Sequence, residues 1–147
     1  MDVTLRRFDE LTLIELHDVL RLRADVFVVE QNCPYLDPDG ADPTALHVLA
    51  HEEGELAGYA RIQETPDGPR IGRVVTAMNA RGHGLGHALV RACVAAIGPR
   101  PSFLLAQDHL RVFYAAHGFA AVGSVFLEDG IPHIRMERAS AEPDIPR

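Results

Sequence analysis

The sequence predicts a single α/β domain in which helices flank a central sheet. One reason is the stretch 74–90, where β-branched residues typical of a buried strand precede a glycine-rich turn and an amphipathic helix. Another is the order of the elements: a strand, a helical region, three strands, a helix, a strand, a helix and two strands. The third is length, because 147 residues suffice for one domain with a sizeable core.

The composition is that of an ordinary globular protein, with 47% hydrophobic and 24% charged residues. The formal charge of −7 argues against a nucleic-acid-binding protein, whose surface has to neutralise phosphates. We see no signal-peptide pattern and no apolar run of membrane-spanning length, so we expect no membrane partner. The two cysteines, Cys33 and Cys93, form no disulfide framework, and a reducing cytoplasm is the expected compartment.

The N-terminal half begins with a short strand over residues 3–8. Thr12 and Glu15 form a capping box that starts a helix running to about Val26. The helix is expected to give way to a loop before Pro34, because the residue before a proline avoids helical geometry. Its predicted apolar face consists of Leu13, Leu16, Leu20, Ala24 and Phe27.

An acidic, turn-rich segment follows at residues 37–42. A calcium loop fails on spacing, since Ala41 and Val48 occupy positions that need oxygen ligands. We therefore expect a solvated loop or one rim of a site for a cationic substrate. Residues 46–51 and 56–62 are then predicted to form two strands around a tight turn.

The second half contains a βαβ unit. A strand over residues 70–77 leads through the glycine turn into a helix that stops before Gly98. Residues 102–106 are wholly apolar, as expected of a parallel strand covered on both faces. The predicted apolar helix face comprises Leu85, Ala88, Leu89, Ala92 and Ala96. The remaining elements are a helix at 107–117, hairpin strands at 119–127 and 132–136, and a polar tail.

Gly82, Gly84 and Gly86 remove three side chains within five residues at the junction of strand and helix. The bare turn and the helix start expose unpaired backbone N–H groups, which together with the helix dipole favour an anion, best a phosphate. The spacing excludes the dinucleotide fingerprint, because His87 stands where its third glycine belongs, and no P-loop lysine follows. A flexible turn before a core helix is the alternative.

Two motifs resemble those of the GNAT superfamily of acetyltransferases. From Arg81 onward, the turn has the pattern Arg-x-x-Gly-x-Gly of the pyrophosphate-binding motif. Residues 113–119 resemble the Phe-Tyr-x-x-x-Gly-Phe segment common in that superfamily. Segments 26–35, 106–110 and 128–134 resemble the ElaA-like family in particular, so that the likeness covers nearly the whole chain.

The resemblance implies a GNAT domain over residues 1–138, with a mixed, mostly antiparallel central sheet whose central strands splay apart, and a flexible tail over residues 139–147. It also implies an N-acetyltransferase that passes the acetyl group of its co-substrate, acetyl-CoA, directly to an amine of a small molecule or peptide. The residues implied to bind acetyl-CoA are Val75, Thr76, Arg81, Gly82, His83, Gly84, Leu85, Gly86 and His87.

These residues divide by the part of acetyl-CoA that they are expected to hold. Backbone N–H groups of the turn would bind the pyrophosphate. Backbone groups of Val75 and Thr76 would pair with the pantetheine amides, as a peptide pairs with an exposed strand edge. Arg81 either adds charge near a phosphate or is a solvated surface residue.

Tyr114 matches the tyrosine that, in the resemblance, protonates the leaving CoA thiolate, and a phenol stays protonated at neutral pH. A core aromatic on an amphipathic helix is the alternative. The base that takes the proton of the amine, or the group that binds the ammonium, is sought among Glu30, Asp39, His47 and His133. Glu30 and His133 stand in ElaA-like segments, so together with Tyr114 they are the predicted catalytic residues.

No metal is expected, because His83 and His87 lie four residues apart without a third assignable ligand. Two other functions stay open. One is a non-catalytic sensor of acyl-CoA or a nucleotide, and the other is an acyl-homoserine-lactone-type synthase, which residues 23–28 loosely resemble. An exposed strand of the terminal hairpin also offers a way to pair two subunits in a homodimer.

Overall fold

The computed structural model describes residues 1–140 and confirms the predicted α/β fold class. A seven-stranded sheet has the order β1-β2-β3-β4-β5-β7-β6. Its pairs are antiparallel except for β4 with β5, which are parallel as the βαβ unit requires. The strands are β1 (Asp2–Arg7), β2 (Leu46–Glu52), β3 (Glu55–Thr65), β4 (Gly68–Thr76), β5 (Ser102–Gln107), β6 (Ala120–Glu128) and β7 (Ile131–Arg138).

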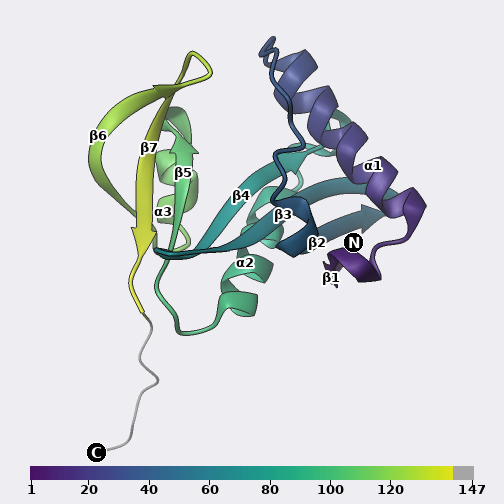
Figure 1. The fold of residues 1–147 in the computed structure, drawn as a ribbon, viewed down its shortest axis with the longest axis horizontal. Coiled ribbons are helices and arrows are strands. Elements are labelled where there is room, and N and C mark those ends of the chain that lie inside the picture. The colour runs from purple at the N-terminus through teal and green to yellow at the C-terminus, as the bar shows by residue number, and fades with distance from the viewer. Residues whose placement is uncertain (141–147) are drawn as a thin grey trace, which may run out of the picture.

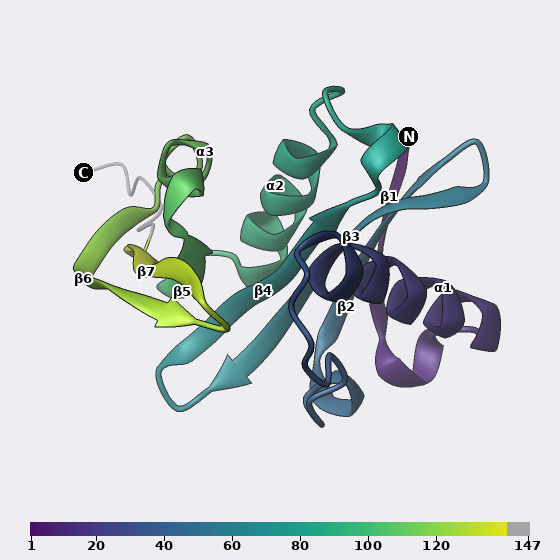
Figure 2. The same ribbon diagram turned by 90° about the horizontal axis from the view of Figure 1, so that it is seen from above.

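Three α-helices accompany the sheet: α1 (Leu13–Arg23), α2 (Leu85–Ile97) and α3 (Arg111–Ala115). Helices α1 and α2 cover opposite faces of the β1–β4 part, as Figure 2 shows. Among residues 1–140, no helix has the length and apolarity needed to cross a bilayer. Residues 141–147 of the predicted tail lie outside the described part of the chain.

Helix α2 builds the larger core. Its buried side consists of Leu85, Leu89, Val90, Cys93 and Ile97, which pack with β2, β3 and β4. Leu85 and Leu89 belong to the predicted face, whereas the predicted Ala92 is only partly buried. The large side chains therefore decide the orientation of the helix, because they bury more apolar surface than alanines do.

The N-terminal helix differs from its prediction in two ways. Its capping box is confirmed, since Thr12 Oγ1 accepts from the Glu15 N–H at 3.0 Å. The predicted apolar face is wrong at Leu13, which is 86% exposed, whereas Phe27 does pack against the buried Val19, Leu22 and Val26. The helix was predicted to end at about Val26, but beyond Arg23 it continues as a π-helix, η2 (Ala24–Glu30).

The strands β4 and β5 separate soon after they meet. Only Arg70 with Phe103 and Ile71 with Leu104 are paired, and Figure 1 shows β5, β7 and β6 turning away from β4. On its other edge β4 carries a bulge, where two residues lie opposite Ala60 of β3 and Arg73 has a φ of +52°. A bulge bends its strand, so this one lies where β4 leaves β5.

Among the C-terminal elements, the helix is shorter than predicted and the hairpin strand β6 is exposed. The helix forecast over 107–117 contains a single short 3-10 turn followed by α3. Every residue of β6, the strand at the edge of the sheet, is exposed, including Leu127 at 72%. An edge strand offers unpaired backbone groups, but pairing of two subunits through β6 stays a prediction.

A network of buried charges fixes the acidic segment 37–42 to the sheet. Its members are Arg23, Arg61, Arg73, Asp37, Asp39 and Asp42. The guanidinium of Arg23, which is fully buried, donates to Asp37 and to Asp42, both at 2.7 Å. The segment is therefore anchored by arginines of α1, β3 and β4 and is not a freely solvated loop.

We predict that Arg23→Ala lowers the free energy of unfolding by about 3–5 kcal/mol, because it leaves buried carboxylates without their cation. The matched control is Arg21→Ala in the same helix, whose side chain is 74% exposed and lies 3.9 Å from Asp25. This control is expected to cost about 0.5 kcal/mol or less. Urea unfolding at neutral pH measures both, and equal losses would contradict the role given to the network.

Candidate functional site

A first cavity, of about 430 Å³, lies between β4, the glycine turn and α3. We call it the turn cavity. Of the residues predicted to bind acetyl-CoA, all but His83 line it. Its lining consists of Val74, Val75, Thr76, Ala80, Arg81, Gly82, Gly84, Leu85, Gly86, His87, Leu110, Phe113 and Tyr114.

The backbone of the turn explains why glycines are needed there. Gly82 and Gly84 have φ angles of +87° and +76°, which side-chain-bearing residues rarely adopt, and a Cβ at either position would meet nothing within 4 Å. The space over the turn is thus open. Gly84 is the N-cap of α2 and provides no side-chain cap, so the first N–H groups of the helix remain available to an anion.

The side chain of His87 ties the start of α2 to α3. Its Nδ1 lies 2.8 Å from Nε2 of His117, and its ring lies 4.5 Å from that of Phe113. Gly86 permits this close packing, because a Cβ there would lie 3.2 Å from the Phe113 ring. The turn and the helix that carries Tyr114 are therefore held together as one unit.

A second cavity, of about 670 Å³, opens where β4 and β5 separate. We call it the cleft cavity. One wall comes from η2 and the loop after it, and the other from the β6–β7 hairpin. The two walls touch where the Cys33 thiol donates to the backbone oxygen of Asp129 at 3.4 Å. The cleft is therefore bounded by segments that lie far apart in the sequence.

The two cavities meet at Tyr114. They share this residue together with Arg81, Leu110 and residues 74–76 of β4. The Tyr114 side chain is 7% exposed, and burial raises the pKa of its phenol above the ordinary value. Its hydroxyl has no hydrogen-bond partner among residues 1–140 and is not sealed off from solvent. The phenol therefore stays protonated and is free to donate into the shared space.

Glu30 and Arg81 form a bidentate ion pair. Both Arg81 terminal nitrogens lie 2.8 Å from the Glu30 carboxylate oxygens, and Nη2 also donates to the Thr76 carbonyl at 3.3 Å. The hydrogen bonds from Arg81 hold the pKa of Glu30 below its ordinary value. A carboxylate in this state is a weak proton acceptor, so Glu30 is better suited to fixing Arg81 beside β4.

His133 lines the cleft cavity with one ring nitrogen available. Its Nδ1 lies 2.7 Å from the Ile131 carbonyl, which requires the proton of the neutral ring to be on Nδ1. Its Nε2 lies 3.7 Å from Glu128 and keeps its lone pair, while the ring stacks on Phe126. In this tautomer the Nε2 lone pair is available as a hydrogen-bond acceptor in the cleft.

The other two candidates have existing partners. Asp39 lines the cleft, but hydrogen bonds from Arg61 hold the pKa of its carboxyl well below the ordinary value. His47 is buried and does not line either cavity; its Nε2 lies 2.9 Å from the Asp42 carbonyl and its Nδ1 is bonded to Tyr59. Asp39 and His47 are therefore both engaged in contacts within the protein.

The structure adds cleft residues that sequence reasoning did not single out. Arg70 of β4, together with Gln107 and His109 at the end of β5, lines the cleft cavity. Position 70 lay in a predicted strand. The neighbouring sequence does not distinguish an arginine that lines a cavity from one that faces solvent. Residues 107 and 109 did stand in an ElaA-like segment, which was the available signal.

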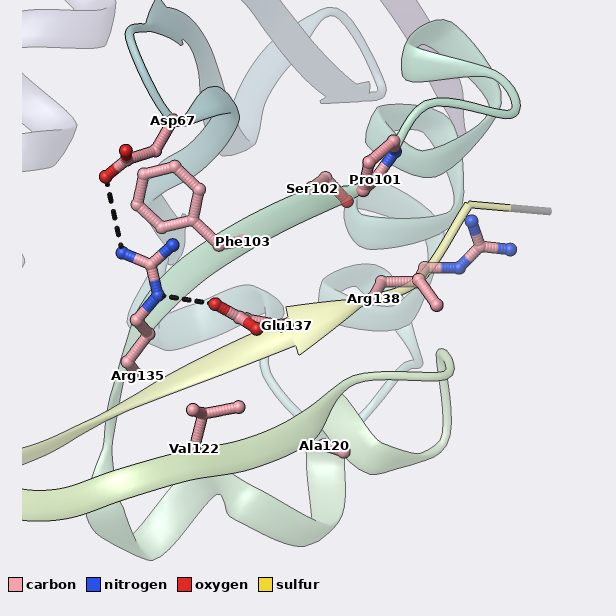
Figure 3. A pocket seen from close by; sticks show the side chains of 10 residues that line it. Asp67, Pro101, Ser102, Phe103, Ala120, Val122, Arg135, Glu137 and Arg138 are labelled. Carbon is pink, nitrogen blue, oxygen red and sulfur yellow. Dashed lines mark hydrogen bonds and ion pairs between the residues drawn. The ribbon is translucent and has the colours of Figure 1, made fainter.

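A third cavity, of about 360 Å³, lies against β5, β7 and β6 and is lined by neither Tyr114 nor the glycine turn. We call it the sheet cavity. Figure 3 shows Arg135 reaching across it to Asp67 and Glu137, at 3.8 and 2.8 Å. The guanidinium also lies 4.0 Å from the centre of the Phe103 ring. The positive charge of Arg135 is thus already balanced by these two carboxylates.

No group of three or more histidine, cysteine, aspartate or glutamate side chains within residues 1–140 is placed to hold a metal ion. The polar side chains of the cleft instead pair with one another or point into the space. Tyr114 and His133 both line the cleft cavity.

Comparison with known proteins decides the family. Residues 28–140 match the family model described as an acetyltransferase (GNAT) domain. The chain belongs to the GNAT acetyltransferase family. The protein ElaA of Escherichia coli K12 is 44% identical over 138 residues, which cover 88% of this chain and 90% of ElaA.

Solved GNAT structures have the same architecture. An acyl-CoA N-acyltransferase from Pseudomonas aeruginosa matches with a TM-score of 0.89 and 42% identity, over 95% of this chain and 100% of that one. The crystal structure of E. coli ElaA matches with a TM-score of 0.87 and 40% identity, over 93% and 98% of the two chains. The match to residues 28–140 includes the glycine turn, Tyr114 and His133.

The geometry at His133 makes a prediction of its own. We expect the neutral ring to carry its proton on Nδ1, because the Ile131 carbonyl accepts there. Long-range ¹H–¹⁵N spectra of the ring, recorded above the pKa of the ring, distinguish the two tautomers. A proton on Nε2 would contradict the availability of that nitrogen to a substrate.

Proposed function

We propose that the protein is an N-acetyltransferase that transfers the acetyl group of acetyl-CoA directly to an amine. The observation that carries the proposal is the meeting of the two cavities at Tyr114, between the open edge of β4 and the glycine turn. Membership of the GNAT family and likeness to an acyl-CoA N-acyltransferase support it. The cytoplasm remains the expected compartment.

The turn cavity suits the acyl-CoA. The N–H groups of residues 82–87 converge at the start of α2 and are suited to hold the pyrophosphate. Beyond Ile71, β4 has no strand partner on the β5 side, so alternate backbone groups of residues 72–76 are free to pair with the pantetheine amides. One of these N–H groups is also the natural donor to the thioester oxygen as negative charge develops on it.

The cleft cavity suits the amine. The amine loses a proton to Nε2 of His133, directly or through water, and its nitrogen forms a bond to the thioester carbon. The C–S bond then breaks, and the thiolate takes the Tyr114 phenolic proton. Burial raises the pKa of Tyr114, so the phenol carries its proton when the substrates bind.

The glycine turn provides the test of acyl-CoA binding. Gly84→Val places a β-branched residue at a φ of +76° and fills the open space, so acetyl-CoA binding measured by calorimetry is expected to be lost. Gly54→Val is the matched control, because Gly54 has a φ of +79°, equally open surroundings and a place in the β2–β3 turn. Unchanged acetyl-CoA binding in Gly84→Val would refute the proposed site.

Tyr114→Phe separates an acyltransferase from a non-catalytic sensor. We predict that the variant binds acetyl-CoA as the parent does, because only the hydroxyl is removed, whereas kcat for acetyl transfer falls about 100-fold or more. The two measurements are calorimetry and detection of free CoA thiol with an amine panel. Undiminished kcat would remove Tyr114 from the mechanism, and absence of transfer by the parent protein would favour the sensor.

A further inference from the structure

The cleft cavity contains three arginines, and they differ in what they contact. Arg73 donates to Asp37 at 2.9 Å, and Arg81 is held by Glu30. Arg70 has no hydrogen bond, and no carboxylate lies within 4.0 Å of it, among residues 1–140. One cation of the cleft thus lacks a partner.

Arg70 is not an ordinary surface arginine. It lies in the middle of the sheet, opposite Gln63 of β3 on one side and Phe103 of β5 on the other, one residue before the strands separate. The residue is partly buried, and burial lowers the pKa of its guanidinium below the ordinary value. An arginine nevertheless keeps its charge in proteins, so the fold holds a cation without a direct ion pair in a partly desolvated place.

The charges around Arg70 explain why the cavity does not neutralise it. The carboxylates nearest to it are Glu128 and Asp39, and the neighbouring cations are Arg61 and Arg73. Asp39 is bonded to both of these arginines, and the contact of Glu128 within 4.0 Å is with His133. The carboxylates of segment 37–42 are therefore bonded to the network, and Glu128 attracts Arg70 but forms no ion pair with it within 4.0 Å.

We propose that Arg70 binds an anionic group, a carboxylate or a phosphate, of the amine that accepts the acetyl group. The inference rests on the proposed function and narrows its substrate class. A guanidinium presents donors in a planar fork that matches a carboxylate or phosphate with two hydrogen bonds. The sequence alone had suggested a cationic substrate from residues 37–42, but in the structure arginines compensate that segment.

The position of Arg70 limits the size of the acceptor. The two cavities begin to overlap at Val74, four positions after Arg70. Four positions along an extended strand span about 13 Å. The bulge at Arg73 shortens this path. The amine and the anion are therefore expected in one small molecule or at one end of a short peptide.

The test compares amines that differ only in the anionic group. With CoA present, calorimetry measures binding of 4-aminobutyrate against butylamine, and of O-phosphoethanolamine against ethanolamine, so that the carboxylate and phosphate sources are separated. At least one amine that carries an anionic group is expected to bind about 10- to 100-fold more tightly than the counterpart that lacks this group. A panel of ω-amino acids from glycine to 6-aminohexanoate then locates the best separation of the two groups.

Substitutions of Arg70 test whether this residue causes the preference for amines that carry an anionic group. Arg70→Gln is expected to abolish it, and Arg70→Lys to keep part of it, because an ammonium retains the charge but not the fork. Arg135→Gln is the matched control, since it removes an arginine that lines the sheet cavity and not the cleft. In acetyl transfer, Arg70→Gln is expected to raise KM for the anionic amine and leave kcat largely unchanged.

The outcomes separate this inference from the proposed function. If neither anionic amine is preferred, or if the preference survives in Arg70→Gln, the inference is overturned, whatever the protein does with acetyl-CoA. If the preference exists and depends on Arg70 but no acetyl transfer occurs, the inference stands and the proposed function fails. Unchanged acetyl-CoA binding in Arg70→Gln shows that the variant is folded.

Discussion

The separation of β4 from β5 is the constraint on which the rest of the site depends. Two strands that paired along their full length would satisfy each other's backbone groups and leave no room between them. Here pairing stops at Ile71 and Leu104, and the bulge at Arg73 bends β4 at that point. The freed edge of β4 therefore meets solvent or a ligand, and both cavities open along it.

The ion pairs among the charged residues then determine which side chains in the cleft cavity are free to contact a ligand. Buried arginines neutralise the acidic segment 37–42, and Glu30 is committed to Arg81. Among the cleft groups without an ion pair or hydrogen bond to the network are the phenol of Tyr114, Nε2 of His133 and the guanidinium of Arg70. An acid, a base and an anion-binding cation are what transfer to an anionic amine would require.

The features predicted from the sequence were those set by neighbouring residues. The capping box at Thr12, the glycine turn and the stop of α2 before Gly98 each depend on side chains within one helical turn. The fold class followed from the order of such elements together with the family resemblance. Resemblance, and not periodicity, brought Tyr114 and His133 into the candidate set.

What the sequence did not reveal depends on contacts between distant residues. The burial of Arg23 needs Asp37 and Asp42. The π-helix places Glu30 beside Arg81, 51 residues further along the chain. Arg70 becomes distinctive only because the neighbouring arginines have partners. Those partners come from distant parts of the chain, so no local sequence pattern reveals the difference.

Amide hydrogen exchange with and without acetyl-CoA tests the central claim most directly. The account predicts slower exchange at residues 72–76 of β4 and at residues 82–87 of the turn, because their N–H groups acquire acceptors. Amides around the sheet cavity of Figure 3, at residues 102–103 and 135–138, are expected to stay unchanged. Protection confined to the sheet cavity, or none along β4, would contradict the claim that the open edge of β4 binds the acyl donor.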